Sequence, residues 1–232
     1  SREHWGIFGT NLNKDFRIED CYLNRVDVHY HCWNLSIIGS HIGDRGITVT
    51  GGGNLFIENS SCSGQNFINF RSDYGSKWDG DIKIKNCTFK VNYDQKDIAI
   101  LKFSPQNFDY KYPIRFGKNI LIENLSVDFN NDVSKDAPCW LIKVPKFSAM
   151  KNGENIHFPD FIKFENIKVI GREKGLRLFS LADQSGYRVD KRGGYNNDML
   201  VSNAMFYFKN VQLENLSNEK DQFHFMMDFD SK

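Results

Sequence analysis

The chain has 232 residues, with 30 basic and 29 acidic side chains, a formal net charge of +1 and 40% hydrophobic residues. This length and composition fit one well-buried domain over the whole chain, because no Pro- or Ser-rich linker divides it. The balanced charge lacks the basic footprint of a nucleic-acid-binding protein, and no apolar run approaches the roughly 20 residues of a membrane span. The first residues do not have the layout of a signal peptide.

One short phrase recurs seven times along the chain: two apolar residues at alternate positions, then usually Asn, then an apolar residue three positions later. In chain order the copies are FRIEDCYL from Phe16, LSIIGSHI from Leu35, LFIENSSC from Leu55, IKIKNCTF from Ile82, ILIENLSV from Ile120, IKFENIKV from Ile162 and FYFKNVQL from Phe206. The alternation has the period of a strand with one buried face, so each copy predicts a strand. A unit repeated this often predicts a stacked architecture.

The fifth position of each copy predicts a sharp corner, because residue types that accept a left-handed backbone at low cost occupy it. These residues are Asp20, Gly39, Asn59, Asn86, Asn124, Asn166 and Asn210. A second short strand should begin near the apolar residue that follows each corner, and a third must fit before the next copy. The copies start 19, 20, 27, 38, 42 and 44 residues apart, so the later rungs should carry growing insertions.

A column of Asn between two short strands resembles the asparagine ladder of right-handed parallel β-helices of the pectate-lyase-like superfamily. The resemblance covers about residues 16–229. It implies an all-β fold, a right-handed single-stranded parallel β-helix with an Asn-rich corner ladder and long loop insertions in later rungs. The chain begins almost directly in a rung and stops just after a strand-like segment. We therefore expect a segment of a longer coil, or a piece that other chains complete.

The five Cys residues do not suggest disulfides or a metal site. Cys62 occupies the apolar position after its corner, and Cys21 and Cys87 directly follow theirs. Recurrence at equivalent positions favours small core residues, since free Cys packs as a small hydrophobe. We predict neither a bound metal nor a cofactor.

The most unusual local sequence is RVDVHYHCW, residues 25–33. Strand alternation predicts Val26, Val28, Tyr30 and Cys32 on the core side. It then places a cation, a carboxylate and two imidazoles in line on the opposite face, namely Arg25, Asp27, His29 and His31.

The next two rungs should extend this polar face. We align Ile47 and Val49 with Val26 and Val28. This alignment places Thr48 beside Asp27 and Thr50 beside His29. Asp44 and Arg45 then lie just before the start of the strand. The third rung offers Asn69 and Arg71, or in the other register Ile68 and Phe70, with Asp73 nearby.

Several chemistries are open to this face. In a hydrolase, Asp27 and either Asp44 or Asp73 would form a carboxylate pair, one giving a proton to the glycosidic oxygen and the other activating water or attacking. In a lyase, His29 or His31 would remove the proton next to a uronate carboxylate neutralised by Arg25 or Arg45. Asp27, His29 and His31 could instead share a metal ion, or the face could be solvated and hold an Arg25–Asp27 salt bridge.

Aromatic residues in the insertions could wall a carbohydrate groove, because their exposed faces can stack on sugar rings. Tyr74 and Trp78 are the first candidates. The others are Phe108, Tyr110, Tyr112, Trp140, Phe147, Tyr187 and Tyr195.

Among proteins of this build, the chain resembles bacteriophage tailspikes and polysaccharide depolymerases. That resemblance implies recognition and cleavage, by hydrolase or lyase chemistry, of a bacterial surface polysaccharide, assembly as a homotrimer, and a place in the virion tail or outside the cell. The chain departs from classical pectate lyases and polygalacturonases, because their calcium-binding Asp cluster, basic arrangement and Asp-rich pattern have no match. A non-catalytic receptor-binding or structural section of a fibre, and a polysaccharide epimerase or deacetylase, remain alternatives.

Overall fold

The computed structural model describes residues 6–71, 77–92, 98–104, 114–130, 135–144, 156–157, 159–181 and 205–214. All regular secondary structure in these segments is β-strand. The strands are β1 (Gly6–Thr10), β2 (Asn13–Glu19), β3 (Tyr22–Val28), β4 (Cys32–Ile38), β5 (His41–Ile42), β6 (Ile47–Val49), β7 (Gly51–Glu58), β8 (Ser61–Gly64), β9 (Asn66–Phe70), β10 (Trp78–Val91), β11 (Ile98–Phe103), β12 (Ile114–Arg115), β13 (Asn119–Asp128), β14 (Cys139–Val144), β15 (Ile156–His157), β16 (Phe161–Ile170), β17 (Arg177–Leu181) and β18 (Met205–Val211). The all-β prediction is therefore confirmed for this part of the chain.

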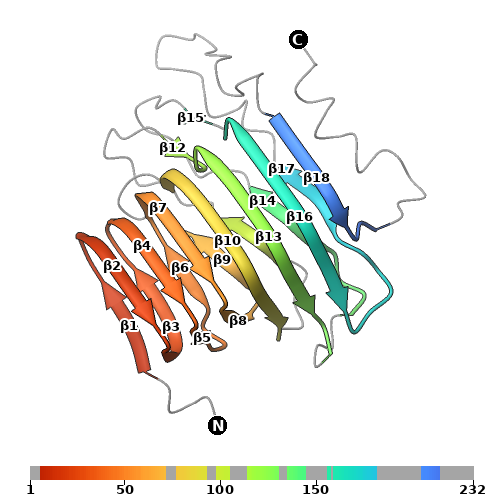
Figure 1. Ribbon diagram of the computed structural model, residues 1–232, viewed down its shortest axis with the longest axis horizontal. Coiled ribbons are helices and arrows are strands. Elements are labelled where there is room, and N and C mark those ends of the chain that lie inside the picture. The colour runs from red at the N-terminus through yellow and green to blue at the C-terminus, as the bar shows by residue number, and fades with distance from the viewer. Residues whose placement is uncertain are drawn as a thin grey trace.

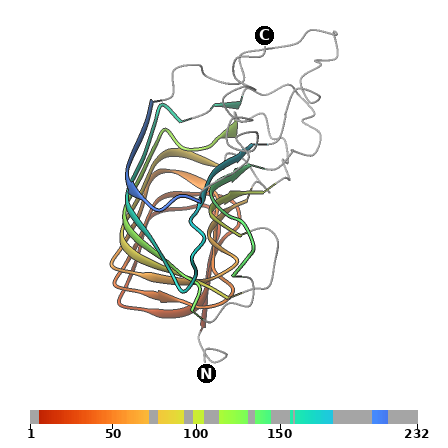
Figure 2. The ribbon, with the colours of Figure 1, turned by 90° about the vertical axis from the view of Figure 1, so that its right-hand side faces the viewer.

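The strands stack in parallel, rung upon rung, as Figure 1 shows from the red N-terminal strands to the blue β18. One column, before the corners, runs through β2, β4, β7, β10, β13, β16 and β18. A second column, after the corners, contains the start of β3, then β5, β8 and the later halves of the long strands. The third column contains β1, the end of β3, β6, β9, β11, β14 and β17. In Figure 2 the successive rungs appear as loops of similar outline, offset from one another, which is consistent with a β-helix solenoid.

Each predicted corner has a left-handed backbone. The φ angles of Asp20, Gly39, Asn59, Asn86, Asn124, Asn166 and Asn210 all lie between 50° and 60°. In the later rungs the corner side chains also bond to one another. Asn124, Asn166 and Asn210 each donate Nδ2–H to Oδ1 of the Asn one rung earlier, at 2.9 Å. These amide contacts hold successive corners in register.

The interior is apolar and includes four of the five thiols. Cys32, Cys62, Cys87 and Cys139 are buried, Cys21 is partly buried, and all five are free. Burial raises the pKa of the Cys62 thiol to about 12 and that of Cys87 to about 11. The prediction that Cys62 and Cys87 pack as small hydrophobes is confirmed.

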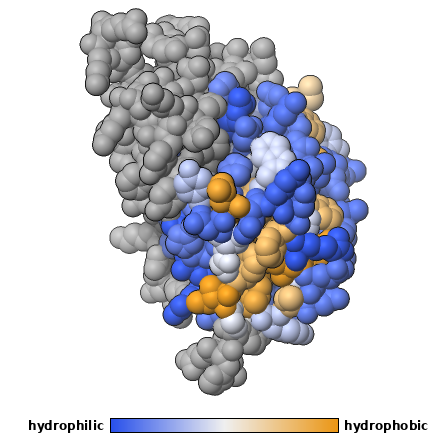
Figure 3. All heavy atoms as spheres, turned by 90° about the vertical axis from the view of Figure 1, so that its left-hand side faces the viewer, coloured by the Kyte–Doolittle hydropathy of each residue, from blue (hydrophilic) through white to orange (hydrophobic). Residues whose placement is uncertain are grey.

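The two end rungs of the described coil expose apolar side chains. Ile7 and Leu12 are exposed at the N-terminal end, where Figure 3 shows hydrophobic atoms among hydrophilic ones. Met205 and Phe208 are exposed on β18. Among the described residues there is no helix with the length and apolar character needed to cross a membrane.

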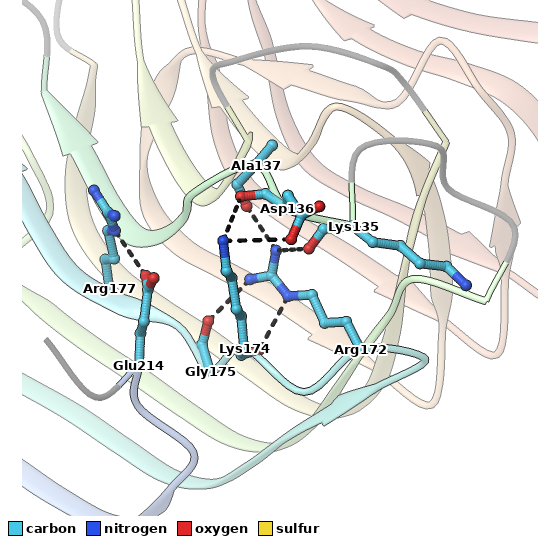
Figure 4. A network of polar contacts seen from close by, with 8 residues as sticks. All are labelled: Lys135, Asp136, Ala137, Arg172, Lys174, Gly175, Arg177 and Glu214. Atoms are coloured by element: carbon cyan, nitrogen blue, oxygen red, sulfur yellow. Dashed lines mark hydrogen bonds and ion pairs between the residues drawn. The ribbon is translucent and has the colours of Figure 1, made fainter.

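One arginine ties together the turns that lead into β14 and β17 (Figure 4). Arg172 donates hydrogen bonds to four backbone carbonyls, those of Lys135, Ala137, Lys174 and Gly175, at 2.6 to 3.2 Å. Its guanidinium carbon also lies 3.8 Å from the centre of the Phe129 ring. Two insertions that belong to neighbouring rungs are thereby fixed to each other.

Candidate functional site

A polar position repeats along the third column. Register pairing aligns Asp27, Thr48, Asn69, Lys102, Lys143 and Ser180 one after another. We call this set the polar row. With parallel strands spaced about 4.8 Å apart, it extends over about 24 Å.

The sequence predicted the beginning of this row. Thr48 pairs with Asp27 and Asn69 pairs with Thr48, as expected. Ile68 and Phe70 are fully buried, so the register with Asn69 and Arg71 turned away from the core is the one that forms.

Asp27 is the centre of a charged cluster. Its Oδ1 lies 2.7 Å from Arg71 Nη1, and its Oδ2 lies 2.9 Å from Arg25 Nη2 and 2.8 Å from His29 Nε2. Only 9% of the Asp27 side chain is exposed, against 50% for His29. The predicted Arg25–Asp27 salt bridge is therefore present, within a larger cluster that spans three rungs.

This arrangement suits Asp27 for orienting its neighbours. Asp27 Oδ1 accepts a hydrogen bond from Arg71, and Oδ2 forms an ion pair with Arg25. When the neutral His29 ring donates Nε2–H to Asp27, Nδ1 remains as its basic nitrogen. A half-exposed imidazole oriented by a carboxylate has the features of a general base.

Two hollows flank the cluster. One, of about 490 Å³, is lined by residues that include Arg25, Asp44, Arg45, Thr48 and Asn69. The other, of about 710 Å³, is lined by Gly9, Thr10, Asn11, Asn13, Phe16, His29 and Tyr30. Asp27 therefore contacts one side chain from each hollow, Arg25 from the first and His29 from the second.

The pairing of Asp27 with Asp44 or Asp73 stays a prediction. Asp44 lines the first hollow and accepts a hydrogen bond from Asn92 Nδ2, whereas Asp27 is bound by its three cationic or imidazole partners. Asp73, the other predicted partner, lies outside the described residues, as does Tyr74.

His31 does not join His29 on Asp27. Strand β3 ends at Val28, so the alternation does not continue to His31, whose ring stacks on Trp33 with centroids 6.1 Å apart. Burial lowers the pKa of His31, and Asp79 acts in the opposite direction. Within the described residues, no group of three or more His, Cys, Asp or Glu side chains is placed to hold a metal ion.

Two predicted substrate-binding residues are in fact buried. Thr50 follows β6 at the next corner and is fully inaccessible, so its placement beside His29 on the outer face is wrong. Trp78 begins β10, is also fully buried, and donates Nε1–H to the Gly53 carbonyl at 3.2 Å. The prediction that Trp78 walls a groove is therefore wrong.

Of the other predicted aromatic residues, only Trp140 lies in the described part of the chain. It lies on β14, partly buried, with the Arg177 guanidinium 5.3 Å from its ring centre. Phe108, Tyr110, Tyr112, Phe147, Tyr187 and Tyr195 lie outside the described residues.

Sequence reasoning missed the two lysines of the polar row. Lys102 and Lys143 are each the only charged residue of an apolar strand, IAILKF and CWLIKV. That isolated charge at matching positions was the available signal. Thr10, which lines the second hollow with its buried hydroxyl unpaired, was missed as well.

The fold and this surface define an all-β protein built from one large parallel sheet, with the polar row along its third column. Over 96 aligned residues the chain is 31% identical to a depolymerase specific for capsule KL64, from Klebsiella phage P510. The alignment covers 36% of this chain and 9% of the phage protein, so the chain spans only a small part of that relative. No protein-family model and no solved structure matches the chain.

Proposed function

We propose that this chain is part of a tailspike-like depolymerase that binds and cleaves an acidic bacterial capsule polysaccharide. In this proposal the coil is a right-handed parallel β-helix of the pectate-lyase-like kind, with its corner amides forming an asparagine ladder. It would act as a homotrimer in the virion tail. The similarity to a capsule-specific phage depolymerase supports the class of substrate.

The observation that carries the proposal is the charge of the surface around Asp27. Arg25, Arg71, Lys102 and Lys143 place four cations along the third column, and Asp27 is the carboxylate between Arg25 and Arg71. These cations lie along about 19 Å of the column, from β3 to β14, so they could contact several units of a polyanion at once, and such a field also steers a charged polymer toward the surface.

The geometry favours lyase chemistry among the catalytic possibilities. His29 would take the proton from the carbon next to a uronate carboxylate, while Arg25 or Arg71 neutralises that carboxylate. The bond from the neighbouring ring carbon to the glycosidic oxygen would then break, leaving a carbon–carbon double bond in the sugar, and the departing oxygen would take a proton from water. Arg45 and Asn69, on the first hollow, would bind adjoining units.

A non-catalytic recognition module is the second candidate. One observation favours it: both oxygens of Asp27 are already engaged, so the cluster is also a stable binding surface without a reactive acid.

The test compares the wild-type chain with His29→Ala and with a control, Arg17→Gln, which removes an exposed ion pair on β2. Each is incubated with KL64 capsule and other acidic and neutral capsules, and reducing ends and the ultraviolet absorbance of unsaturated uronate are followed. A lyase gives both signals in the wild type and control and neither in His29→Ala. Reducing ends without absorbance indicate a hydrolase, binding without shortening leaves the recognition module, and no binding to any polymer rejects the proposal.

A further inference from the structure

A second surface with features of a saccharide site lies around the corner from the polar row. Trp33 is the second residue of β4, and the residue is 42% exposed. Large aromatic side chains are usually more deeply buried, and a fixed exposed ring offers an apolar face to a ligand.

The glycines of the next rung make room for this indole. A Cβ atom on Gly52 would lie 2.6 Å from Trp33 Cζ3 and 2.9 Å from Cε3, and one on Gly53 would lie 3.1 Å from Cε2. The ring therefore occupies the space that side chains at these positions would need. On another side, the His31 ring is stacked on it at an interplanar angle of 19°.

The backbone that carries Trp33 is also held in place. The next residue, Asn34, has a left-handed φ of 64°. Its Nδ2 donates to Asp15 on the preceding rung at 2.7 Å, and its Oδ1 accepts from the Asn54 backbone on the following rung at 2.8 Å. The indole is thus pre-positioned, which lowers the entropy cost of binding a ligand.

An ion pair supplies polar groups on the far side of Gly52 from the ring. In the register of the sheet, Gly52 pairs with Trp33 on one side and with Asp79 on the other, so Asp79 lies two rungs from Trp33. The indole extends over Gly52, in the direction of Asp79. Arg115 Nε lies 3.1 Å from Asp79 Oδ1 but makes no hydrogen bond of good geometry. The Arg115 side chain is 36% exposed and the Asp79 side chain 45% exposed, so both can contact a ligand.

We propose that Trp33, Asp79 and Arg115 form a second saccharide subsite, which takes an uncharged pyranose unit. The apolar face of the sugar stacks on the indole, hydroxyl groups donate to the Asp79 carboxylate, and hydroxyl oxygens accept from Arg115. The balanced ion pair matches hydroxyl groups, which donate and accept, better than it matches a carboxylate. The inference rests on the proposed recognition of a polysaccharide, but it uses residues separate from the Asp27 cluster.

The experiment measures binding of KL64 capsule fragments, and of fragments of the other capsules, by calorimetry. The variants are Trp33→Ala, Trp33→Phe and Arg115→Gln, with Arg17→Gln as the control. We expect Trp33→Ala to weaken binding about tenfold, which corresponds to about 1.4 kcal/mol, Arg115→Gln to weaken it less, and the control to bind as wild type. Trp33→Phe keeps a flat ring and should recover much of the affinity.

Tryptophan fluorescence gives a second readout. Fragments should change the emission of the wild type and of His29→Ala, and should leave that of Trp33→Phe unchanged. If the wild type binds a capsule and Trp33→Ala binds it equally well, the subsite is rejected while the proposed function stands. If the wild type binds no capsule, both proposals fail together.

Discussion

Arg71 Nη1 lies 2.7 Å from Asp27 Oδ1, although 44 residues separate them along the chain. Arg71 follows β9 and Asp27 lies on β3, with β6 between them in the sheet. The arginine therefore bridges an entire rung to reach a carboxylate that is almost buried. This contact links the electrostatics of the candidate site to the stability of the first rungs.

Replacing Arg71 by Ala should leave Asp27 Oδ1 without its cation. Because the carboxylate is only 9% exposed, we expect a loss of roughly 1–3 kcal/mol in the free energy of unfolding, measured by urea titration. Capsule binding should weaken as well. Asp27→Asn in the Arg71→Ala background should cost much less than Asp27→Asn alone, and additive effects of the two changes would argue against a direct interaction.

Asn124 tests what the corner side chains contribute. Asn124→Ala removes the side-chain hydrogen bonds to Asn86 and Asn166. It also places alanine, which has a Cβ atom but no polar side chain, at a left-handed φ of 54°. Asn124→Gly removes the same bonds but tolerates this backbone. We expect thermal unfolding to show Ala as the less stable variant by about 1 kcal/mol. Equal melting of the two variants would mean that backbone conformation contributes nothing at this corner.

Arg172 should be irreplaceable by lysine. Its planar guanidinium donates hydrogen bonds to four backbone carbonyls at once. The ammonium group of lysine cannot reproduce this planar arrangement of donors. We expect both Arg172→Ala and Arg172→Lys to lose about 2 kcal/mol of stability in urea titrations. Lys174→Gln, which removes only an exposed contact to Asp136, is the matched control. Wild-type stability of Arg172→Lys would show that charge alone is sufficient.

His31 should make stability depend on pH. Burial lowers its pKa in the folded chain, so the unfolded chain binds the proton more readily. The free energy of unfolding should therefore fall as the pH drops below about 6.5, the ordinary value for histidine. His157, whose pKa burial and Arg115 also lower, should act in the same direction. Unfolding titrations of His31→Gln between about pH 5 and 7.5 should show a shallower slope, and an unchanged slope would contradict this.

The corners were predictable because a left-handed backbone restricts the residue type, and that restriction leaves a signature at every rung. Strand ends left no such signature. His31 was misplaced because alternation was extended through a turn, and Thr50 for the same reason. Trp78 was read as part of an insertion, although it has the same parity as Ile82 and Ile84, two core residues of β10. The contacts of Trp33 with Gly52 and Gly53 join separate rungs, and no local pattern reports them.

The unequal lengths of the rungs have a consequence for how the chain folds. Equivalent positions in the first rungs are 19 or 20 residues apart, against 42 or 44 in the last. Closing a loop costs about 0.6 kcal/mol more for each doubling of its length, so the short rungs lose less entropy when they pair. We expect β2, β4 and β7 to acquire amide protection first in pulsed hydrogen exchange, and simultaneous protection of β16 and β18 would contradict this order. The rungs with the longest insertions would then form after the early rungs, which include Asp27. Sequence changes in those insertions would therefore not alter the first steps of folding.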